Sequence, residues 1–240
     1  MSNEWSSLPA PPDRAPGFTG AAPVPAVERV PAPWALTGEG WVVFIRLSAT
    51  AAARPGFQRP ELRDHWRGGI GALTFMRYRT SGVGPYDEVL FIPGMAQVGG
   101  KWAFSICQIF VTTAESVVNG RANWGIPKDH ADMRITHAAT GEDTLEAGPD
   151  GNPFVRVVAR PGGPYLPVNT AAFRLPMAQV WEGQVYRIGL AVKASVRWLD
   201  VVQLWGDGAH FPSFAGIRPI AGFKLDDFEI TFPTAIVETL

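Results

Sequence analysis

The chain has 240 residues, a net charge of −1 and 46% hydrophobic residues, with nine tryptophans and fourteen phenylalanines. This composition is typical of a globular protein with a sizeable core and excludes a disordered chain. The small net charge gives no electrostatic basis for binding nucleic acid or an acidic membrane surface. No apolar run reaches the roughly 18–20 residues that a membrane-spanning helix needs. We therefore expect a soluble cytoplasmic protein.

Cysteine and histidine are scarce. The single cysteine, Cys107, excludes an internal disulfide, and the four histidines lack the spacing of metal ligands. We expect neither a metal nor a cofactor.

Residues 1–36 are rich in proline, alanine and glycine and lack the periodicity of a helix or a strand. We interpret them as an N-terminal extension, either an arm that packs on a neighbouring subunit or a flexible tail. Residues 37–240 are predicted to form one β domain. Because nine tryptophans and long apolar strands are much for one domain to cover, we also predict a homo-oligomer.

Short apolar segments between glycine and proline turns predict strands at residues 41–47, 70–79, 86–92, 102–111, 128–136, 144–146, 154–159, 196–205 and 223–232. Residues 59–67 are a connection with possible helical character. A capping box at residues 112–115 predicts a short helix that ends at Asn119-Gly120. Many short strands with few helices indicate a mainly β fold, an antiparallel sheet or barrel with helical decoration.

One stretch, residues 120–131 (GRANWGIPKDHA), combines two glycines, a proline, a tryptophan and a lysine. The glycines allow backbone angles that are closed to other residues. Pro127 fixes its own φ and forces Ile126 into an extended conformation, so the chain leaves this stretch as a strand. Lys128 is therefore expected at a rigid exit, with Trp124 and Ile126 as apolar walls.

A lysine amine in an apolar pocket has a lowered pKa, because desolvation penalises the ammonium form. A neutral amine can attack a ketone and form an imine. The chain has only four lysines against seventeen arginines, which stay protonated and cannot act as amine nucleophiles. Lys128 is therefore the candidate nucleophile. The alternative is a solvated strand lysine that neutralises Asp129 or Asp132.

The pattern Gly-Arg-x-x-Trp-Gly-Ile-Pro-Lys at residues 120–128 resembles the acetoacetate decarboxylase superfamily, whose Schiff-base lysine follows a proline. The resemblance implies an imine-forming role for Lys128 and assigns Arg121 to the arginine of the motif. It also implies a large antiparallel β structure that closes around a central apolar cavity. Two positions depart from the pattern: Ala122 stands where the family often has glutamate, and Asp129 where the decarboxylase has a second lysine.

Residues 81–88 (SGVGPYDE) resemble the Ser-Gly…Tyr-x-Glu segment of the family, which implies that Glu88 is an active-site glutamate. A carboxylate near an imine can orient the lysine, stabilise the iminium or transfer a proton. Tyr86 lies on the same strand face, where it either binds a substrate oxygen or packs in the core. The alternative for Glu88 is an ordinary solvated glutamate.

Other polar positions of the family are absent. Its substrate-binding arginine aligns with Gly38, and its further glutamate falls near Leu73. Arg77, Arg79 or Arg121 remain as candidates to replace the lost cation.

We therefore expect a Schiff-base lyase, of the decarboxylase or aldolase/dehydratase type, that acts on a keto acid or ketone other than acetoacetate. The catalytic residues would be Lys128 and Glu88, and the residues expected to bind the small-molecule substrate are Arg121, Trp124, Tyr86 and Ile126. The competing hypothesis is a protein of the same fold that binds a small apolar ligand without covalent chemistry.

Overall fold

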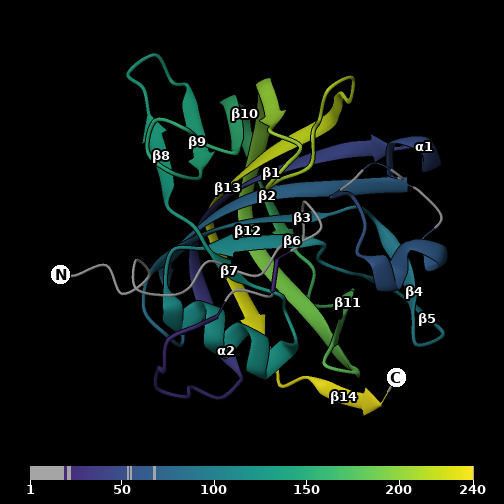
Figure 1. Ribbon diagram of the computed structural model, residues 1–240. Helices are drawn as coiled ribbons and strands as arrows, with labels where there is room; N and C mark the ends of the chain where they lie inside the picture. Colours follow the sequence, from purple (N-terminus) through teal and green to yellow (C-terminus); the bar gives the residue numbers. More distant parts are fainter. Residues whose placement is uncertain (1–18, 21–22, 53, 55, 67–68, 240) are drawn as a thin grey trace.

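The computed structural model describes residues 19–20, 23–52, 54, 56–66 and 69–239 (Figure 1). Strands dominate this part of the chain. The elements are β1 (Trp34–Leu47), α1 (Ala49–Ala52), the 3-10 helix η2 (Pro60–His65), β2 (Gly69–Thr80), β3 (Tyr86–Ile92), β4 (Met95–Val98), β5 (Lys101–Phe104), β6 (Gln108–Val111), α2 (Ala114–Trp124), β7 (Asp129–His130), β8 (Met133–His137), β9 (Asp143–Ala147), β10 (Val155–Asn169), β11 (Leu175–Trp181), β12 (Gln184–Gly206), β13 (Pro219–Phe232) and β14 (Ile236–Thr239).

The strands form one large sheet in the hydrogen-bonded order β4-β5-β11-β12-β13-β1-β2-β3-β6-β7, with β10 and β14 paired to β12, and β8 and β9 joined through β10. Most pairs are antiparallel, which confirms the predicted fold class, but β5 pairs with β11 and β6 with β7 in parallel. Among the described residues the order does not return on itself. The sheet is therefore open rather than a closed barrel, and one end strand, β7, has only two residues.

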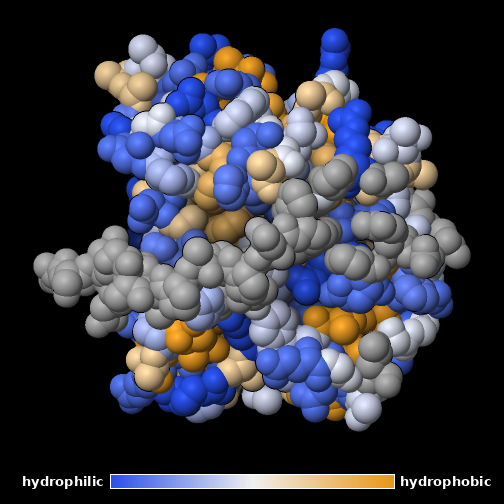
Figure 2. All heavy atoms as spheres, viewed as in Figure 1, coloured by the Kyte–Doolittle hydropathy of each residue, from blue (hydrophilic) through white to orange (hydrophobic). Residues whose placement is uncertain are grey.

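Two large hydrophobic clusters and a smaller third one fill the interior, and β1 contributes to both large clusters. The Trp41 cluster is built around residues that include Trp41 and Phe91. The Tyr86 cluster contains Tyr86, Val117 of α2 and Phe228 of β13. Burying one such side chain contributes about 1.5–3 kcal/mol. On the face drawn in Figure 2, hydrophobic patches interrupt a mostly hydrophilic surface. None of the helices in the described ranges has the length and hydropathy needed to span a bilayer.

The single strand predicted at residues 102–111 is wrong, because the chain forms two strands there, β5 and β6. The chain changes partners between them: β5 pairs with β4 and β11, whereas β6 pairs with β3. The two segments also differ in burial. Trp102 is half exposed, whereas Gln108 is completely buried.

The helix of the lysine stretch is longer than predicted. It begins after Thr113, whose side chain accepts a hydrogen bond from the Ser116 amide, and it continues to Trp124. Gly120 therefore lies inside the helix and does not end it. Gly125, with a φ of 61°, is the left-handed C-cap.

The strand predicted at residues 128–136 is also divided, into β7 and β8, because Ala131 leaves the ladder after its amide bonds to the Val111 carbonyl. The strands predicted at residues 144–146 and 154–159 correspond to β9 and β10, which pair as an antiparallel hairpin. The predicted strands at residues 41–47, 70–79, 86–92, 196–205 and 223–232 lie within observed strands.

The described residues that precede β1 contact α2 and the loop that follows it. The Val30 amide donates to the Asn119 side chain at 2.8 Å, and the Gly20 amide donates to the Asp129 carboxylate at 3.0 Å. This part of the predicted extension packs on its own subunit, and the rest of it lies outside the described residues. The first strand, β1, begins at Trp34, which lies inside the predicted extension. The division of the chain into an extension and a domain at residue 37 stays a prediction.

Candidate active site

The site is assembled by a β6-α2-β7 crossover beside β3. Glu88 of β3 lies opposite Val111 of β6, and Val111 lies in turn opposite His130 of β7. The helix between these two parallel strands ends at Gly125, and the chain then returns to the sheet through Pro127. Lys128 immediately precedes β7, so the crossover places its side chain close to Glu88.

Lys128 and Glu88 form a buried ion pair. The Lys128 Nζ atom lies 2.8 Å from Oε2 of Glu88, and only 4% and 3% of the two side chains are exposed. The same nitrogen donates to Oγ of Ser116 at 3.1 Å and to the Tyr86 hydroxyl at 3.4 Å. The amine is therefore surrounded by oxygen acceptors and not by solvent.

Gly120 makes room for the aliphatic part of Lys128. A Cβ atom at this position would lie 2.6 Å from Cδ of Lys128, a distance that side chains do not tolerate. Gly120 is one helical turn after Ser116, so both residues face the lysine. The helix thus contains a residue of low helix propensity where the lysine chain passes closest to it.

Two tyrosines in ring contact complete the polar surroundings of the ion pair. Tyr78 of β2 is paired with Tyr86 of β3 across the hairpin, and their ring centroids are 4.6 Å apart. The Tyr78 hydroxyl donates to Oε1 of Glu88 at 2.9 Å. Burial and the charge of Glu88 raise the pKa of Tyr78 well above its ordinary value. Burial also raises the pKa of Tyr86 to about 12, against the opposing charge of Lys128, so both side chains are neutral hydroxyls at physiological pH.

The charge state of Lys128 differs from the sequence-based expectation. Burial by itself would lower the pKa of Lys128, but the Glu88 carboxylate and Tyr86 outweigh burial, and the pKa lies above its ordinary value. The expectation of a neutral resting amine is therefore wrong. The reason is that the charge and hydrogen-bond contacts of Glu88 and Tyr86 together stabilise the ammonium more than desolvation destabilises it.

Arg121 and Asp129 hold the backbone of Lys128 and not its amine. The Arg121 Nε atom donates to the Lys128 carbonyl at 2.9 Å, and Nη2 lies 2.6 Å from the Asp129 carboxylate. Asp129 thus points away from the amine, as the alternation of side chains along a strand allows. The guanidinium also lies over the Trp181 ring, 5.6 Å from its centroid.

The two expected apolar walls, Trp124 and Ile126, are buried in the Tyr86 cluster. The indole nitrogen of Trp124 donates to the Pro233 carbonyl at 2.7 Å, and its ring packs edge-on against Trp34. Trp124 therefore anchors the end of α2. The substrate-binding roles of Trp124, Ile126, Tyr86 and Arg121 stay predictions.

The sequence-based interpretation missed Ser116 and Tyr78. Ser116 lies in the first turn of a helix, where serine is common, and only its spacing of four residues from Gly120 gave a signal. Tyr78 became significant only with the register of the β2–β3 hairpin, which places it opposite Tyr86. Neither contact could be read from a local motif.

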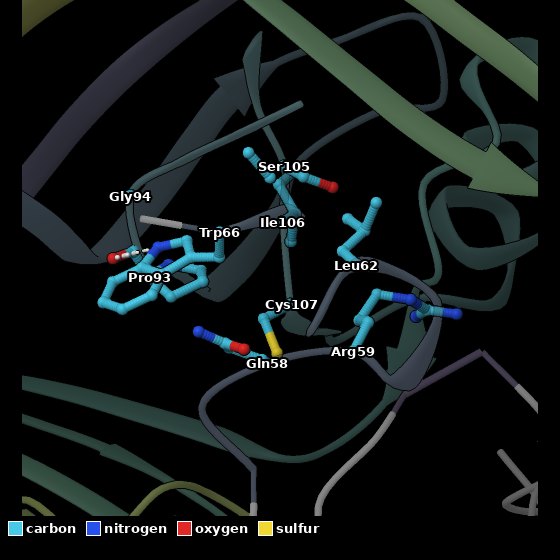
Figure 3. Close-up of a pocket in the computed structure, with 10 residues that line it drawn as sticks. Gln58, Arg59, Leu62, Trp66, Pro93, Gly94, Ser105, Ile106 and Cys107 are labelled. Atoms are coloured by element: carbon cyan, nitrogen blue, oxygen red, sulfur yellow. Dashed lines mark hydrogen bonds between the residues drawn. The ribbon is translucent and has the colours of Figure 1, made fainter. Parts of the chain in front are cut away.

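Two hollows lie near these strands. A small one of about 10 Å³ is lined by residues that include Gln58, Trp66 and Cys107 (Figure 3). It has room for one water molecule at most. Burial raises the pKa of the Cys107 thiol, whose sulfur contacts the Gly56 carbonyl, so Cys107 is an unreactive core residue. A larger open hollow of about 430 Å³ borders Tyr78 and Tyr86.

Across the part of the chain that the structure describes, no three His, Cys, Asp or Glu side chains are grouped so that they could hold a metal ion. The charged groups at the amine are Lys128 and Glu88. The arrangement can therefore transfer a proton between an amine and a carboxylate and donate hydrogen bonds from neutral hydroxyls.

Solved structures with the same fold include three enzymes of low sequence identity. Acetoacetate decarboxylase from Legionella pneumophila has a TM-score of 0.60 at 12% identity, with 91% of this chain and 93% of that chain covered. The enduracididine biosynthesis enzyme MppR has a TM-score of 0.59 at 16% identity, with 87% and 88% covered. An acetoacetate decarboxylase-like enzyme from Sphingomonas wittichii RW1 has a TM-score of 0.59 at 12% identity, with 87% and 94% covered.

No curated protein matches the chain by sequence. A sequence model of the acetoacetate decarboxylase family matches residues 22–180, more than half of the chain and the part that contains both Glu88 and Lys128. This protein therefore belongs to the acetoacetate decarboxylase family.

Proposed function

We propose that this protein is a Schiff-base lyase that acts on a keto acid or ketone, with Lys128 as the nucleophile and Glu88 as the proton-transfer group. The observation that carries the proposal is the buried ion pair between these two residues, 2.8 Å apart. Family membership supports lyase chemistry. MppR, which shares the fold, is complexed with pyruvate in one structure and with a condensation product of pyruvate and imidazole 4-carboxaldehyde in another. Both ligands derive from carbonyl compounds.

The ion pair supplies the proton transfers that imine formation requires. Glu88 accepts a proton from the Lys128 ammonium, and the neutral amine then attacks the carbonyl carbon. Proton transfer gives a neutral carbinolamine, and the Glu88 carboxylic acid returns its proton to the hydroxyl that leaves as water. The product is a positively charged iminium beside an ionised Glu88. The net charge of the pair is the same before and after the reaction.

The iminium is an electron sink, so it allows a bond to the α or β carbon of the substrate to break. Decarboxylation, retro-aldol cleavage and dehydration all begin from this intermediate. The altered polar positions of the family pattern, including Asp129 in place of a second lysine, argue against acetoacetate itself. They favour a larger and more apolar carbonyl compound.

Reductive trapping tests the proposal directly. The full chain is incubated with a panel of ketones, aldehydes and keto acids in the presence of borohydride, and its intact mass is measured. The proposal predicts one covalent adduct per chain, which peptide mapping places on Lys128. A panel that leaves the mass unchanged while a member still binds by calorimetry would replace the lyase proposal with non-covalent binding.

One observation favours the non-covalent alternative. The raised pKa keeps Lys128 protonated at rest, and an ammonium cannot attack a carbonyl carbon until it loses a proton. The same trapping experiment separates the two functions, because an ammonium that only donates hydrogen bonds forms no reducible imine.

The homo-oligomer and the cytoplasmic location stay predictions. Half-exposed aromatic side chains on β12, Trp198 and Trp205, support an oligomer because such surface is costly to leave in water. Light scattering at micromolar concentration tests this prediction, and a monomer would contradict it.

A further inference from the structure

The candidate site is electrically neutral and lined by neutral donors. One ammonium and one carboxylate cancel at the ion pair, and the other polar groups in contact with it are the hydroxyls of Ser116, Tyr86 and Tyr78. Both tyrosines have raised pKa values and stay uncharged. The remaining surroundings are the apolar side chains of the Tyr86 cluster.

The three arginines that were candidates to bind a substrate carboxylate point to other partners. Arg121 contacts the Asp129 carboxylate and the Lys128 carbonyl. Arg77 donates two hydrogen bonds to Asp87, at 3.1 and 3.3 Å. Arg79 pairs with Asp227 on the surface. Each guanidinium therefore already has a carboxylate as counter-ion, and none of the three contacts the Lys128 amine.

We propose that the site takes an uncharged carbonyl compound, an aldehyde, a ketone or the ester of a keto acid, in preference to a free keto acid. The inference rests on the imine chemistry proposed above and narrows its substrate class. In this arrangement the Ser116 and Tyr86 hydroxyls, which lie 3.1 and 3.4 Å from the amine, donate to the oxygen of the substrate carbonyl.

The charge count explains the preference. With a neutral substrate, the ion pair becomes an iminium beside the Glu88 carboxylate, and the site stays neutral throughout. A keto acid adds a second negative charge close to Glu88, where each ion is already desolvated. An uncompensated buried charge costs far more than a buried neutral group that finds a hydrogen bond.

The test compares each acid with its own methyl ester. Pyruvate and methyl pyruvate, and acetoacetate and methyl acetoacetate, are incubated with the full chain and borohydride, and the rate of adduct formation is measured by intact mass. The mass also distinguishes an ester adduct from an acid adduct formed by hydrolysis. Because esters and acids differ in intrinsic reactivity, each rate is divided by the rate of the same compound with N-acetyl-lysine. The Lys128→Arg variant identifies adducts that form elsewhere.

We expect the corrected rates for the esters to exceed those for the acids by about tenfold or more, which follows from the cost of one uncompensated buried charge. Ser116→Ala should reduce the ester rate several-fold, because it removes a neutral donor. Equal rates, or faster trapping of the acids on Lys128, would overturn the neutral-substrate inference and leave the imine proposal intact. Failure to trap any of the four compounds on Lys128, when N-acetyl-lysine traps them, would overturn both.

Discussion

Two buried lysines of this protein are each paired with a glutamate, and the pKa values of the two lysines shift in opposite directions. The side chains of Lys128 and Lys224 are almost equally buried, with 4% and 3% exposed. Yet the pKa of Lys128 is raised, whereas burial lowers the pKa of Lys224 despite its contact with Glu39. The burial of the lysine therefore does not explain the difference.

The carboxylate partners of the two lysines account for the difference in pKa. Glu88 is 3% exposed and hydrogen-bonded by Tyr78. Glu39 is 22% exposed and lies 3.9 Å from Arg77 and 3.8 Å from His137, so it is shared among several groups and with water. A carboxylate enclosed in a low-dielectric interior attracts a neighbouring ammonium more strongly than one in contact with solvent. The comparison teaches that the environment of the carboxylate partner determines the direction in which the pKa of a buried lysine shifts.

The comparison identifies Lys224 as a second candidate nucleophile, since Lys224 releases its proton more readily than Lys128. The largest expected effect is therefore on imine trapping. Lys128→Arg should abolish trapping of any substrate that the wild type traps, because arginine stays protonated and offers no lone pair. Lys224→Arg is the matched control and should trap at the wild-type rate. The reverse result, measured by intact mass after borohydride reduction, would make Lys224 the nucleophile.

The second largest expected effect is on the free energy of unfolding, which should fall by different amounts when each lysine is replaced. Lys128→Met leaves Glu88 buried without its counter-ion, which costs about 3–5 kcal/mol of unfolding free energy at neutral pH. Lys224→Met should cost less, because Glu39 keeps Arg77 and its contact with water. Urea denaturation measures both values. The double variant Lys128→Met/Glu88→Gln should recover part of the loss, and a double variant as unstable as the single one would show that packing of the lysine chain causes the effect.

Turnover should respond to only one of the two glutamates. Glu88→Gln removes the proton-transfer group and should slow turnover by about a hundredfold or more. Imine trapping should become slower but should not be abolished, because the nucleophile remains while the group that accepts its proton is lost. Glu39→Gln should leave turnover unchanged. The measurement is the steady-state rate on the trapped substrate. Equal losses in the two variants would mean that Glu88 acts through stability alone.

The smallest expected effect is on the pH dependence of stability, where the two lysines should have opposite signs. The folded pKa of Lys128 lies above the unfolded value of 10.5, so its ion pair stabilises the protein fully below that pH and the contribution is lost as pH rises through the folded pKa. Lys224 has a lowered pKa, so its unfavourable contribution disappears as pH rises. The difference in unfolding free energy between wild type and Lys128→Met should therefore stay constant below pH 10.5 and shrink as pH rises above it. A difference that also stays constant above pH 10.5 would contradict the raised pKa.

Local patterns in the sequence were enough to bring Lys128 and Glu88 into consideration. Pro127 defines the exit of the lysine stretch, and the strand of Tyr86 and Glu88 has the observed bounds. These features depend on neighbours within a few residues. The mainly β fold could also be predicted, because turns and apolar segments alternate along most of the chain.

Long-range partners could not be predicted in the same way. Asp143 belongs to a charged pair of residues in the sequence, Glu142-Asp143, but it is buried and accepts a hydrogen bond from the Trp41 indole at 2.7 Å. Its partner is 102 residues away. The prediction of a neutral Lys128 failed for the same reason. The charge of Lys128 depends on the Glu88 carboxylate, forty residues earlier, and the burial of Glu88 follows from the order of the strands in the sheet.

The enclosure of the Lys128 amine has a kinetic consequence. With 4% of the side chain exposed, a carbonyl compound cannot reach Nζ by diffusion through water alone. Neighbouring side chains must first move aside, and that opening has its own rate, which does not depend on the reagent. The observed rate of adduct formation should therefore level off as the concentration of the carbonyl compound increases, and structurally different compounds should approach the same plateau.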